Sequence, residues 1–427
     1  MFGILLGLIV LMALAYLGWS IIWVAPIAAG VVALTGGLDL LDAYTDTYMG
    51  GFVGFARDWF PVFMLGAIFG KLMEDTGMAK SVAVALTKLI GTKRAILGVI
   101  VACAVLTYGG VSLFVVVFAV YPLALSLFRE ANISRRLMPA AVALGAFTFT
   151  MTAIPGTPQI QNLIPIPYFD TSATAAPIMG IVAALVMGVG GYYYLRWREK
   201  QLTEKGELFT EPKDQKIAGF EGEAPNFVLS LLPLITVLVT LNILDWHIVV
   251  ALISGIILIL LLNISKFKNF VKAINAGAVG SVTAIINTSA AVGFGTVVRE
   301  VPGFERLTEL LLGIRGNPLI SEAVAVNILA GATGSASGGM GIALEALGER
   351  YYQLALDTGI STEAFHRVAS LASGGLDALP HNGAVLTLLT ITGLSHKESY
   401  KDIFVVAVAI PIAATAVAIA LAAVGLV

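Results

Sequence analysis

The 427-residue chain has little of what soluble and secreted proteins depend on. It has a single cysteine, Cys103, so no disulfide can form within the chain, and its four histidines are scattered rather than clustered with it as zinc ligands. Charged residues make up only 12%, against roughly 25% in a soluble domain. The 25 basic residues nearly balance 27 acidic ones, which leaves no basic surface for nucleic acid. A disulfide scaffold, a soluble enzyme and a nucleic-acid binder are all poor fits.

What the chain has in abundance is apolar residues (58%) and glycine (45 residues). Glycine is more frequent in membrane helices than in soluble ones, and a spanning helix needs about 20 mainly apolar residues. The first apolar run lacks the charged start and cleavage site of a signal peptide, so we expect it to be retained. The expected spans are 2–18, 21–37, 51–72, 137–168, 177–195, 226–244, 248–263, 274–297, 364–394 and 403–425.

Two further apolar stretches are broken in the middle by glycine and hydroxyl residues. Residues 95–128 are interrupted at 107–110 and have Lys or Arg at both ends, which tend to stay cytoplasmic. A segment whose two ends lie on the same side of the membrane must turn back inside it. Two ordinary short spans are the alternative interpretation of the same apolar residues. We predict a re-entrant hairpin there (hairpin 1) and a second at 318–347, broken at 333–339 (hairpin 2).

The positive charges favour an outside amino terminus. In that orientation 19 of the Lys and Arg residues fall on the cytoplasmic side, which is the expected bias. The hydrophilic stretch 196–225 then forms a cytoplasmic linker. The five positive residues expected outside are Arg299, Arg306, Arg315, Arg350 and Arg367.

A few polar residues are expected near the membrane surface. His247, His366 and His396 fall at the edges of expected spans, so we expect interfacial positions for them. Arg57 and Asp58 lie near the outer end of a span and are expected to form a shallow ion pair rather than to hold a substrate.

The linker separates two halves that repeat at a nearly constant offset. Each half is expected to cross the membrane an odd number of times, so the second half is inverted relative to the first. Inverted repeats with interrupted helices are the architecture of secondary transporters. Pairs that lie 225 or 226 positions apart are Gly51 and Gly277, Glu74 and Glu300, Gly91 and Gly316, and Pro155 and Pro380.

We therefore predict an all-α polytopic membrane protein with two inverted repeats, 1–195 and 226–427, about ten transmembrane helices and two re-entrant hairpins. Two of the spans are interrupted by proline and glycine, 137–168 (break 1) and 364–394 (break 2). Proline removes a backbone donor and glycine permits left-handed backbone, so together they unwind a helix. Such backbone persists at membrane depth only where protein or a water-filled cavity satisfies it.

The two hairpin tips and the two breaks are expected to meet at a substrate site near the midplane. The amino terminus of a half-helix suits a carboxylate, and with no Lys or Arg expected at mid-depth, backbone N–H groups and hydroxyls would hold it. The alternative is that the small residues only permit close helix packing. The predicted binding residues are Thr107, Ser112, Thr152, Thr157, Gln159, Asn162, Thr333, Ser335, Ser337 and Asn382.

Asp377 and His381 are the ionisable residues of break 2. Ionisable groups inside a membrane are costly and usually functional, and histidine titrates near physiological pH. We expect one of them to carry a coupled proton, His381 before Asp377. The alternative is a structural pair that caps the broken helix ends.

The second half also carries motifs that resemble a known family. The stretch GATGSASGGMGIALEALG, followed by ASGGLDALPHNGAVLTLLTITG and SYKDIF, is similar to the gluconate permease (GntP-type) family of the ion transporter superfamily, and most to its 3-hydroxybutyrate permeases. Gluconate members carry a His- and Pro-rich pattern at break 1, where this chain has Ala-Ile-Pro-Gly-Thr-Pro, which favours a smaller hydroxy acid. The resemblance implies proton-coupled uptake of hydroxy-carboxylates by a homodimer with an elevator motion.

The sequence thus predicts proton-coupled symport of a small hydroxy-monocarboxylate across a bacterial cytoplasmic membrane. It predicts no cofactor, no metal site and no nucleic-acid partner, and leaves sodium open as the coupling ion. A cation/proton antiporter in which Asp377 binds the cation is the main alternative. An intramembrane enzyme using His381, or a non-transporting membrane scaffold, fits the pattern less well because no nucleophile and base have a convincing spacing and a scaffold has no need of two broken helices.

Overall fold

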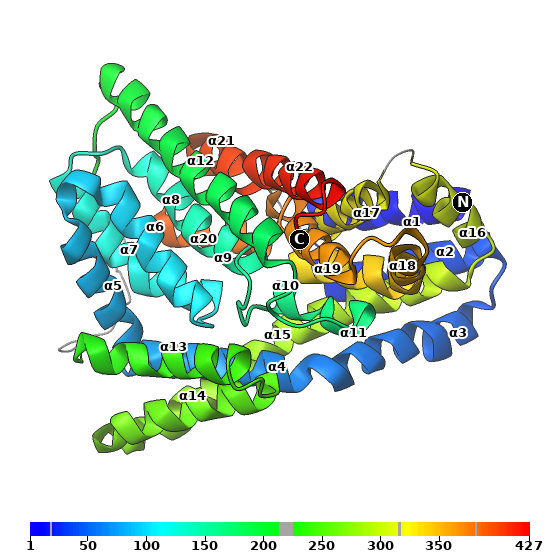
Figure 1. Ribbon diagram of the computed structural model, residues 1–427, viewed down its shortest axis with the longest axis horizontal. Helices are drawn as coiled ribbons and strands as arrows, with labels where there is room; N and C mark the ends of the chain where they lie inside the picture. The colour runs from blue at the N-terminus through cyan, green and yellow to red at the C-terminus, as the bar shows by residue number, and fades with distance from the viewer. Residues whose placement is uncertain (18, 213–224, 315–316, 381) are drawn as a thin grey trace.

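The computed structural model describes residues 1–17, 19–212, 225–314, 317–380 and 382–427, and every regular element in these ranges is helical (Figure 1). Within the described part, four helical segments are long and apolar enough to cross a membrane on their own. The other uninterrupted spans form shorter apolar helices. The all-α membrane fold is confirmed. The four long segments are Leu40–Asp75, Pro177–Glu204, Ile264–Glu300 and His396–Ala423.

The first half begins with an apolar helix pair and ends with one long helix. Its elements are α1 (Phe2–Tyr16), α2 (Ile21–Gly36), α3 (Leu40–Asp42), a π-helical segment (Ala43–Tyr48), α4 (Met49–Asp75), α5 (Met78–Ile90), α6 (Ala95–Tyr108), α7 (Leu113–Glu130), α8 (Met138–Ala146), α9 (Phe149–Thr152), α10 (Ile160–Leu163), α11 (Ile166–Phe169) and α12 (Pro177–Glu204).

The elements of the second half also begin with an apolar helix pair. They are α13 (Phe227–Asn242), α14 (Ile248–Leu262), α15 (Phe267–Glu300), α16 (Gly303–Leu312), α17 (Pro318–Thr333), α18 (Ala336–Thr358), α19 (Thr362–Ser373), a 3₁₀ turn (Leu376–Ala378), α20 (Gly383–Thr392), α21 (His396–Phe404), a second π-helical segment (Val405–Ala409) and α22 (Ile410–Ala423).

The predicted hairpins lie at opposite ends of the molecule. Helices α5, α6 and α7 occupy one end, and α16, α17 and α18 the other (Figure 1). The chain bends by 98° between α5 and the following segment 92–108, as expected of a surface helix that leads into a hairpin. Both hairpins turn where glycine and hydroxyl residues were expected, at 109–112 and 334–335.

The long helices α4 and α15 run antiparallel through the molecule and pack closely. A Cβ atom at Gly277 would lie 2.7 Å from the backbone Cα of Ile68, and one at Gly51 would lie 1.9 Å from Oγ1 of Thr296. Any larger side chain at these positions would push the helices apart. Gly51 of α4 and Gly277 of α15 therefore each lie where the other long helix comes into close contact.

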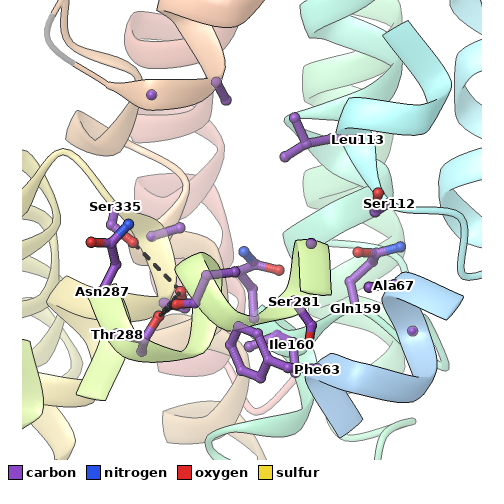
Figure 2. A pocket seen from close by; sticks show the side chains of 18 of the residues that line it. Phe63, Ala67, Ser112, Leu113, Gln159, Ile160, Ser281, Asn287, Thr288 and Ser335 are labelled. Carbon is purple, nitrogen blue, oxygen red and sulfur yellow. Dashed lines mark hydrogen bonds between the residues drawn. The ribbon is translucent and has the colours of Figure 1, made fainter. Parts of the chain in front are cut away.

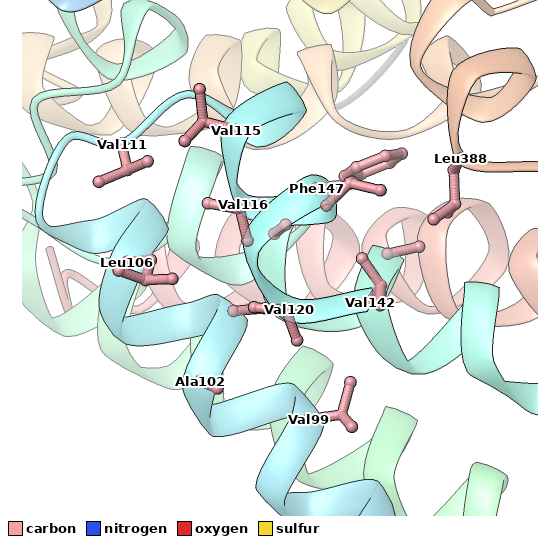
Figure 3. Packing of buried hydrophobic residues seen from close by; sticks show 14 of the residues in the cluster. Val99, Ala102, Leu106, Val111, Val115, Val116, Val120, Val142, Phe147 and Leu388 are labelled. Atoms are coloured by element: carbon pink, nitrogen blue, oxygen red, sulfur yellow. The ribbon is translucent and has the colours of Figure 1, made fainter. Parts of the chain in front are cut away.

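Hairpin 1 packs against broken helices from both halves. Val99 of α6, Val116 of α7 and Val142 of α8 belong to one buried cluster that also includes Leu388 of α20 (Figure 3). Hairpin 2 forms a second cluster with α19 and α22. We refer to the hairpins, the broken helices and α12, α21 and α22 as the core body, and to α1, α2, α4, α13, α14 and α15 as the frame.

Several expected spans are longer in the structure, including 51–72, which is part of the helical segment Leu40–Asp75, and 403–425, which belongs to a segment that begins at His396. Helix α12 continues to Glu204, so the first part of the expected linker is helical. It continues because Arg198 is buried there by an ion pair with Asp402 of α21, with Nε 2.7 Å from Oδ1. Helix α15 begins at Phe267 rather than 274. Most of the remaining linker, 213–224, lies outside the described residues.

Candidate functional site

A cavity of about 650 Å³ lies where the hairpin tips and the breaks meet (Figure 2). Its wall includes residues from both hairpin tips, from both breaks and from α4 and α15 of the frame. Ligand sites commonly occupy about 300–1,000 Å³, so the cavity has room for a small organic molecule with water. The four broken segments, which lie far apart in sequence, thus surround one space.

Most of the predicted binding residues line this cavity, but four of them do not. Thr107, Thr152, Thr157 and Asn162 are buried behind the wall. His381 lies outside the described residues, so its predicted role keeps only its sequence basis. The predicted residues found on the wall are Ser112, Gln159, Thr333, Ser335, Ser337, Asn382 and Asp377.

Three helix amino termini face the cavity. They belong to α7, α18 and α20, whose first turns line the wall with Leu113, Ala336 and Gly383. The first N–H groups of a helix have no acceptor within the helix and carry partial positive charge. At α7 the Ser112 side chain makes no capping bond, so those donors stay open. The cavity wall is therefore suited to an anion.

The hydroxyl groups at the tip of hairpin 2 differ in role: some stabilise the tip itself, and one is available to the cavity. Ser335 Oγ accepts a hydrogen bond from Gly338 N at 3.1 Å and so caps α18. Thr333 Oγ1 donates to backbone carbonyls of its own turn. Ser337 has no such backbone role in the described structure, and its Oγ lies 3.3 Å from Thr288 Oγ1 of α15. Ser337 is thus the tip hydroxyl that is most free to meet a ligand.

Break 2 is tied to hairpin 2 by Asn382. Its Nδ2 donates to Gly334 O at 2.9 Å, and its Oδ1 accepts from the amides of Ala384 and Val385 at the start of α20. Asn382 therefore acts as an N-cap as well as a wall residue. The break and the tip are held together by this side chain.

Break 1 is tied to hairpin 1 by Gln159. Its Nε2 donates to Thr107 O at 2.7 Å, across the gap between the two segments. Tyr108 Oη donates to Pro155 O at 3.0 Å and adds a second link. Thr107 Oγ1 is buried and lacks a hydrogen-bond partner among the described residues.

Arg367, which the charge count expected on the outside, is buried within the core body rather than exposed in a loop. It has no exposed surface, and its guanidinium donates to Ala175 O at 2.6 Å and to Asn162 Oδ1 at 2.8 Å. The charge count expected Arg367 outside because it comes shortly after the loop that precedes α19. In the structure Arg367 lies within α19, most of which is buried. Asn162 is committed to this network and also donates to Thr157 O.

His366 is likewise buried rather than interfacial. Its Nδ1 lies 2.6 Å from Thr171 Oγ1, and its ring has no exposed surface. Like Arg367, it links α19 of the second half to the segment that follows break 1. By contrast, Arg57 and Asp58 form the expected shallow pair, with Nε 2.9 Å from Oδ1 and both side chains more than half exposed.

The sequence-based prediction missed the polar face of α15. Ser281, Asn287 and Thr288 line the cavity from the frame side (Figure 2). The signal was available as the polar run 287–289 inside an otherwise apolar span. Ser281 Oγ donates to Ala278 O, and Thr288 Oγ1 donates to Ala284 O, so both hydroxyls are partly used within their own helix.

Among the described wall residues, only Lys71 and Asp377 have charged side chains. Lys71 is already paired, with Nζ 3.1 Å from Glu74 Oε2 and 2.9 Å from Asp75 Oδ1. Away from the cavity wall, Glu322 of α17 is completely buried, and neither of its carboxyl oxygens has a partner in the described structure. Asp377 is thus the acidic side chain that reaches the cavity.

Comparisons with known proteins agree with this architecture. The model of the GntP family of permeases matches residues 1–244. The uncharacterized transporter YxjC of Bacillus subtilis is 43% identical over 94% of each chain. An uncharacterized permease of Haemophilus influenzae is 29% identical over 49% of this chain and 43% of its own length.

The fold also resembles a solved transporter structure. The crystal structure of the Alcanivorax borkumensis YdaH transporter, described as having an unusual topology, matches with a TM-score of 0.55. The match covers 90% of this chain and 88% of that one at 15% identity, so it supports the fold alone. The family model and the near-full-length similarity to YxjC show that the chain is a multi-pass membrane transporter that belongs to the GntP permease family.

Proposed function

We propose that this permease imports a small hydroxy-monocarboxylate together with a proton across a bacterial cytoplasmic membrane. The observation that carries this proposal is the convergence of three helix amino termini on one cavity. The N–H donors left without a side-chain cap at α7, together with the partial positive charge at all three amino termini, favour a carboxylate. The cavity volume of about 650 Å³ suits a small molecule.

The charge balance of the cavity favours one anionic group per substrate. Lys71 is the positive side chain found on the described wall, and it is neutralised by Glu74 and Asp75. A second carboxylate would have to be buried without a cation, which is costly. A monocarboxylate satisfies the helix amino termini, while the hydroxyls and amides of the wall remain for a neutral polar group.

A test of the activity is uptake of labelled 3-hydroxybutyrate into proteoliposomes under an imposed inward proton gradient. We expect accumulation that collapses when the gradient is dissipated. Cation-driven proton efflux without uptake of any hydroxy acid would instead support a cation/proton antiporter.

Coupling to a proton has an electrostatic reason. Moving one negative charge inward against 100 mV costs about 2.3 kcal/mol, and a co-transported proton cancels that charge. Asp377 lies on the cavity wall with 7% of its surface exposed, and it forms no ion pair in the described structure. We propose that break 2 carries the proton, on His381 or on Asp377.

Substituting His381 and Asp377 one at a time shows which of the two residues carries the proton. The variant His381→Gln keeps hydrogen bonding but cannot titrate, so it is expected to exchange substrate across the membrane and to lose accumulation driven by an imposed pH gradient. Asp377→Asn receives the same assay. Normal pH-driven accumulation in both variants would exclude break 2 as the proton site, and accumulation that follows a sodium gradient would identify Na⁺ as the coupling ion.

The hydroxyl of Ser337 provides a direct test of the anion site. Ser337→Ala is expected to weaken 3-hydroxybutyrate binding about two- to tenfold, the usual value of one hydrogen bond, because this hydroxyl has no capping role. Ser335→Ala is a poorer test, since Ser335 also caps α18. Unchanged affinity in both variants would remove the tip of hairpin 2 from the site.

For the transport cycle we propose an elevator motion in a homodimer. The core body would move against the frame, with α5 and α16 as linking arms at opposite membrane surfaces. Their positions at opposite ends of the molecule support this proposal (Figure 1). The cavity lies between the core body and α4 and α15 of the frame, where such a motion would open and close it.

A further inference from the structure

Among the described residues of the frame that line the cavity, Asn287 has a buried side-chain oxygen without a hydrogen-bond partner. It lines the cavity from α15, beside Ser335 of hairpin 2 (Figure 2). Its Oδ1 atom is buried and has no hydrogen-bond partner among the described residues. A buried polar atom without a partner costs about 1–3 kcal/mol, so the fold retains Asn287 at a penalty that a ligand can remove.

Of the other polar side chains of α15, Ser289 also has a buried hydroxyl without a partner among the described residues, but it does not line the cavity, and the two that do line it are partly satisfied. The hydroxyls of Ser281 and Thr288 donate to carbonyls of their own helix. The amide of Asn287 turns about a soft terminal torsion, so its oxygen can face the cavity when a donor arrives. An acceptor without a partner needs a donor, and a carboxylate has none. An alcohol hydroxyl donates and accepts, and it fits an amide in both roles.

We propose that Asn287 recognises the hydroxyl group of the substrate and so makes the permease select hydroxy acids over simple carboxylates. The spacing supports this role, because the adjacent Thr288 Oγ1 lies 3.3 Å from Ser337 Oγ at the tip. Asn287 lies beside Ser335, the residue that precedes α18 (Figure 2), so a carboxylate held at the first turn of that helix would bring a hydroxyl one or two carbons away toward Asn287. The inference rests on the proposed function. In it the core body binds the carboxylate, and Asn287 of the frame distinguishes substrates that carry a hydroxyl from those that do not.

The experiment compares 3-hydroxybutyrate with butyrate, which lacks only the hydroxyl. Both dissociation constants are measured on purified protein in proteoliposomes, with butyrate as a competitor of labelled 3-hydroxybutyrate. The wild-type protein is expected to bind 3-hydroxybutyrate at least about tenfold more tightly. Asn287→Leu is expected to lose about tenfold in affinity for 3-hydroxybutyrate and to keep its affinity for butyrate, so that the discrimination disappears.

Two further variants keep the test decisive. Asn275→Leu makes the same replacement at an exposed position of α15 that is not part of the cavity wall, and both affinities should stay unchanged. Asn287→Ser serves if the leucine variant does not fold, and it should show reduced discrimination with a partly restored hydrogen bond. Full discrimination in a folded Asn287 variant, or an equal loss for both acids, overturns the inference and leaves the proposed function standing. If wild-type protein binds neither acid, both fail.

Discussion

A disulfide between Gly70→Cys and Val115→Cys is expected to abolish transport and to leave substrate binding intact. Gly70 lies on α4 of the frame, and Val115 lies on α7 in hairpin 1. A Cβ atom at Gly70 would lie 3.4 Å from Val115 Cγ2, which is close enough for a bridge and causes no clash. If the core body must move against the frame, fixing these two positions stops the cycle in one state.

The chain suits this experiment because it has a single native cysteine. Cys103 is buried in the core body, so Cys103→Ala provides a cysteine-free background. The measurement is uptake of labelled 3-hydroxybutyrate before and after treatment with a reductant, alongside equilibrium binding to the oxidised protein. Recovery of uptake on reduction attributes the block to the bridge. Full transport by the fully cross-linked protein would count against an elevator motion.

Arg367→Met is expected to destabilise the protein strongly. Arg367 is completely buried, and its guanidinium satisfies the carbonyl oxygens of Ala175 and Thr152 and the amide oxygen of Asn162. Methionine fills similar space but removes these donors, at about 1–3 kcal/mol for each acceptor left unpaired. Ala175 O loses both guanidinium bonds, whereas Thr152 O keeps its bond from Ser370 Oγ and Asn162 Oδ1 keeps a 3.4 Å contact with His366 Nε2. We therefore expect the free energy of unfolding to fall by about 3–5 kcal/mol in total, because the substitution weakens the contact between α19 and the segment that contains break 1.

The measurement is thermal unfolding in detergent, where we expect the midpoint to fall by about 5–10 °C. Arg350→Met is the matched control, because Arg350 also belongs to the predicted outside group but is exposed in the structure, and its replacement should leave the midpoint unchanged. Arg367→Lys keeps the charge yet cannot form the same forked contacts, so it should rescue the midpoint only in part. A midpoint equal to wild type in Arg367→Met would show that these hydrogen bonds do not hold the two halves together.

The order of elements could be predicted because it depends on local properties. Apolar runs of sufficient length become helices in a membrane, since no other structure satisfies their backbone there. Glycine and proline mark where those helices end, as at the turn of hairpin 2 and at Pro380 in break 2. The predicted repeat has the same local basis, and two of the glycines on which it rests, Gly51 and Gly277, both lie where α4 and α15 pack closely.

The candidate site was predictable only in outline. Glycine, serine and threonine at the breaks indicated which segments approach the cavity, and Ser112, Ser335 and Ser337 do line it. Thr157 and Asn162 have the same composition and the same local setting, yet they are turned into the interior to bond with backbone atoms. Whether a side chain faces the cavity depends on its rotation about an irregular segment, which local sequence does not specify.

The class of protein, the helical segments and the places where the helices break could be predicted from the sequence, because they follow from hydropathy and backbone chemistry. The burial of Arg367 and His366, and the contribution of Asn287 and Thr288 of α15 to the cavity, became apparent from the folded structure. These contacts join residues that lie far apart along the chain. Their partners are chosen by how the two halves pack, and the energy of a buried charge or amide depends entirely on which partners that packing brings within hydrogen-bond distance.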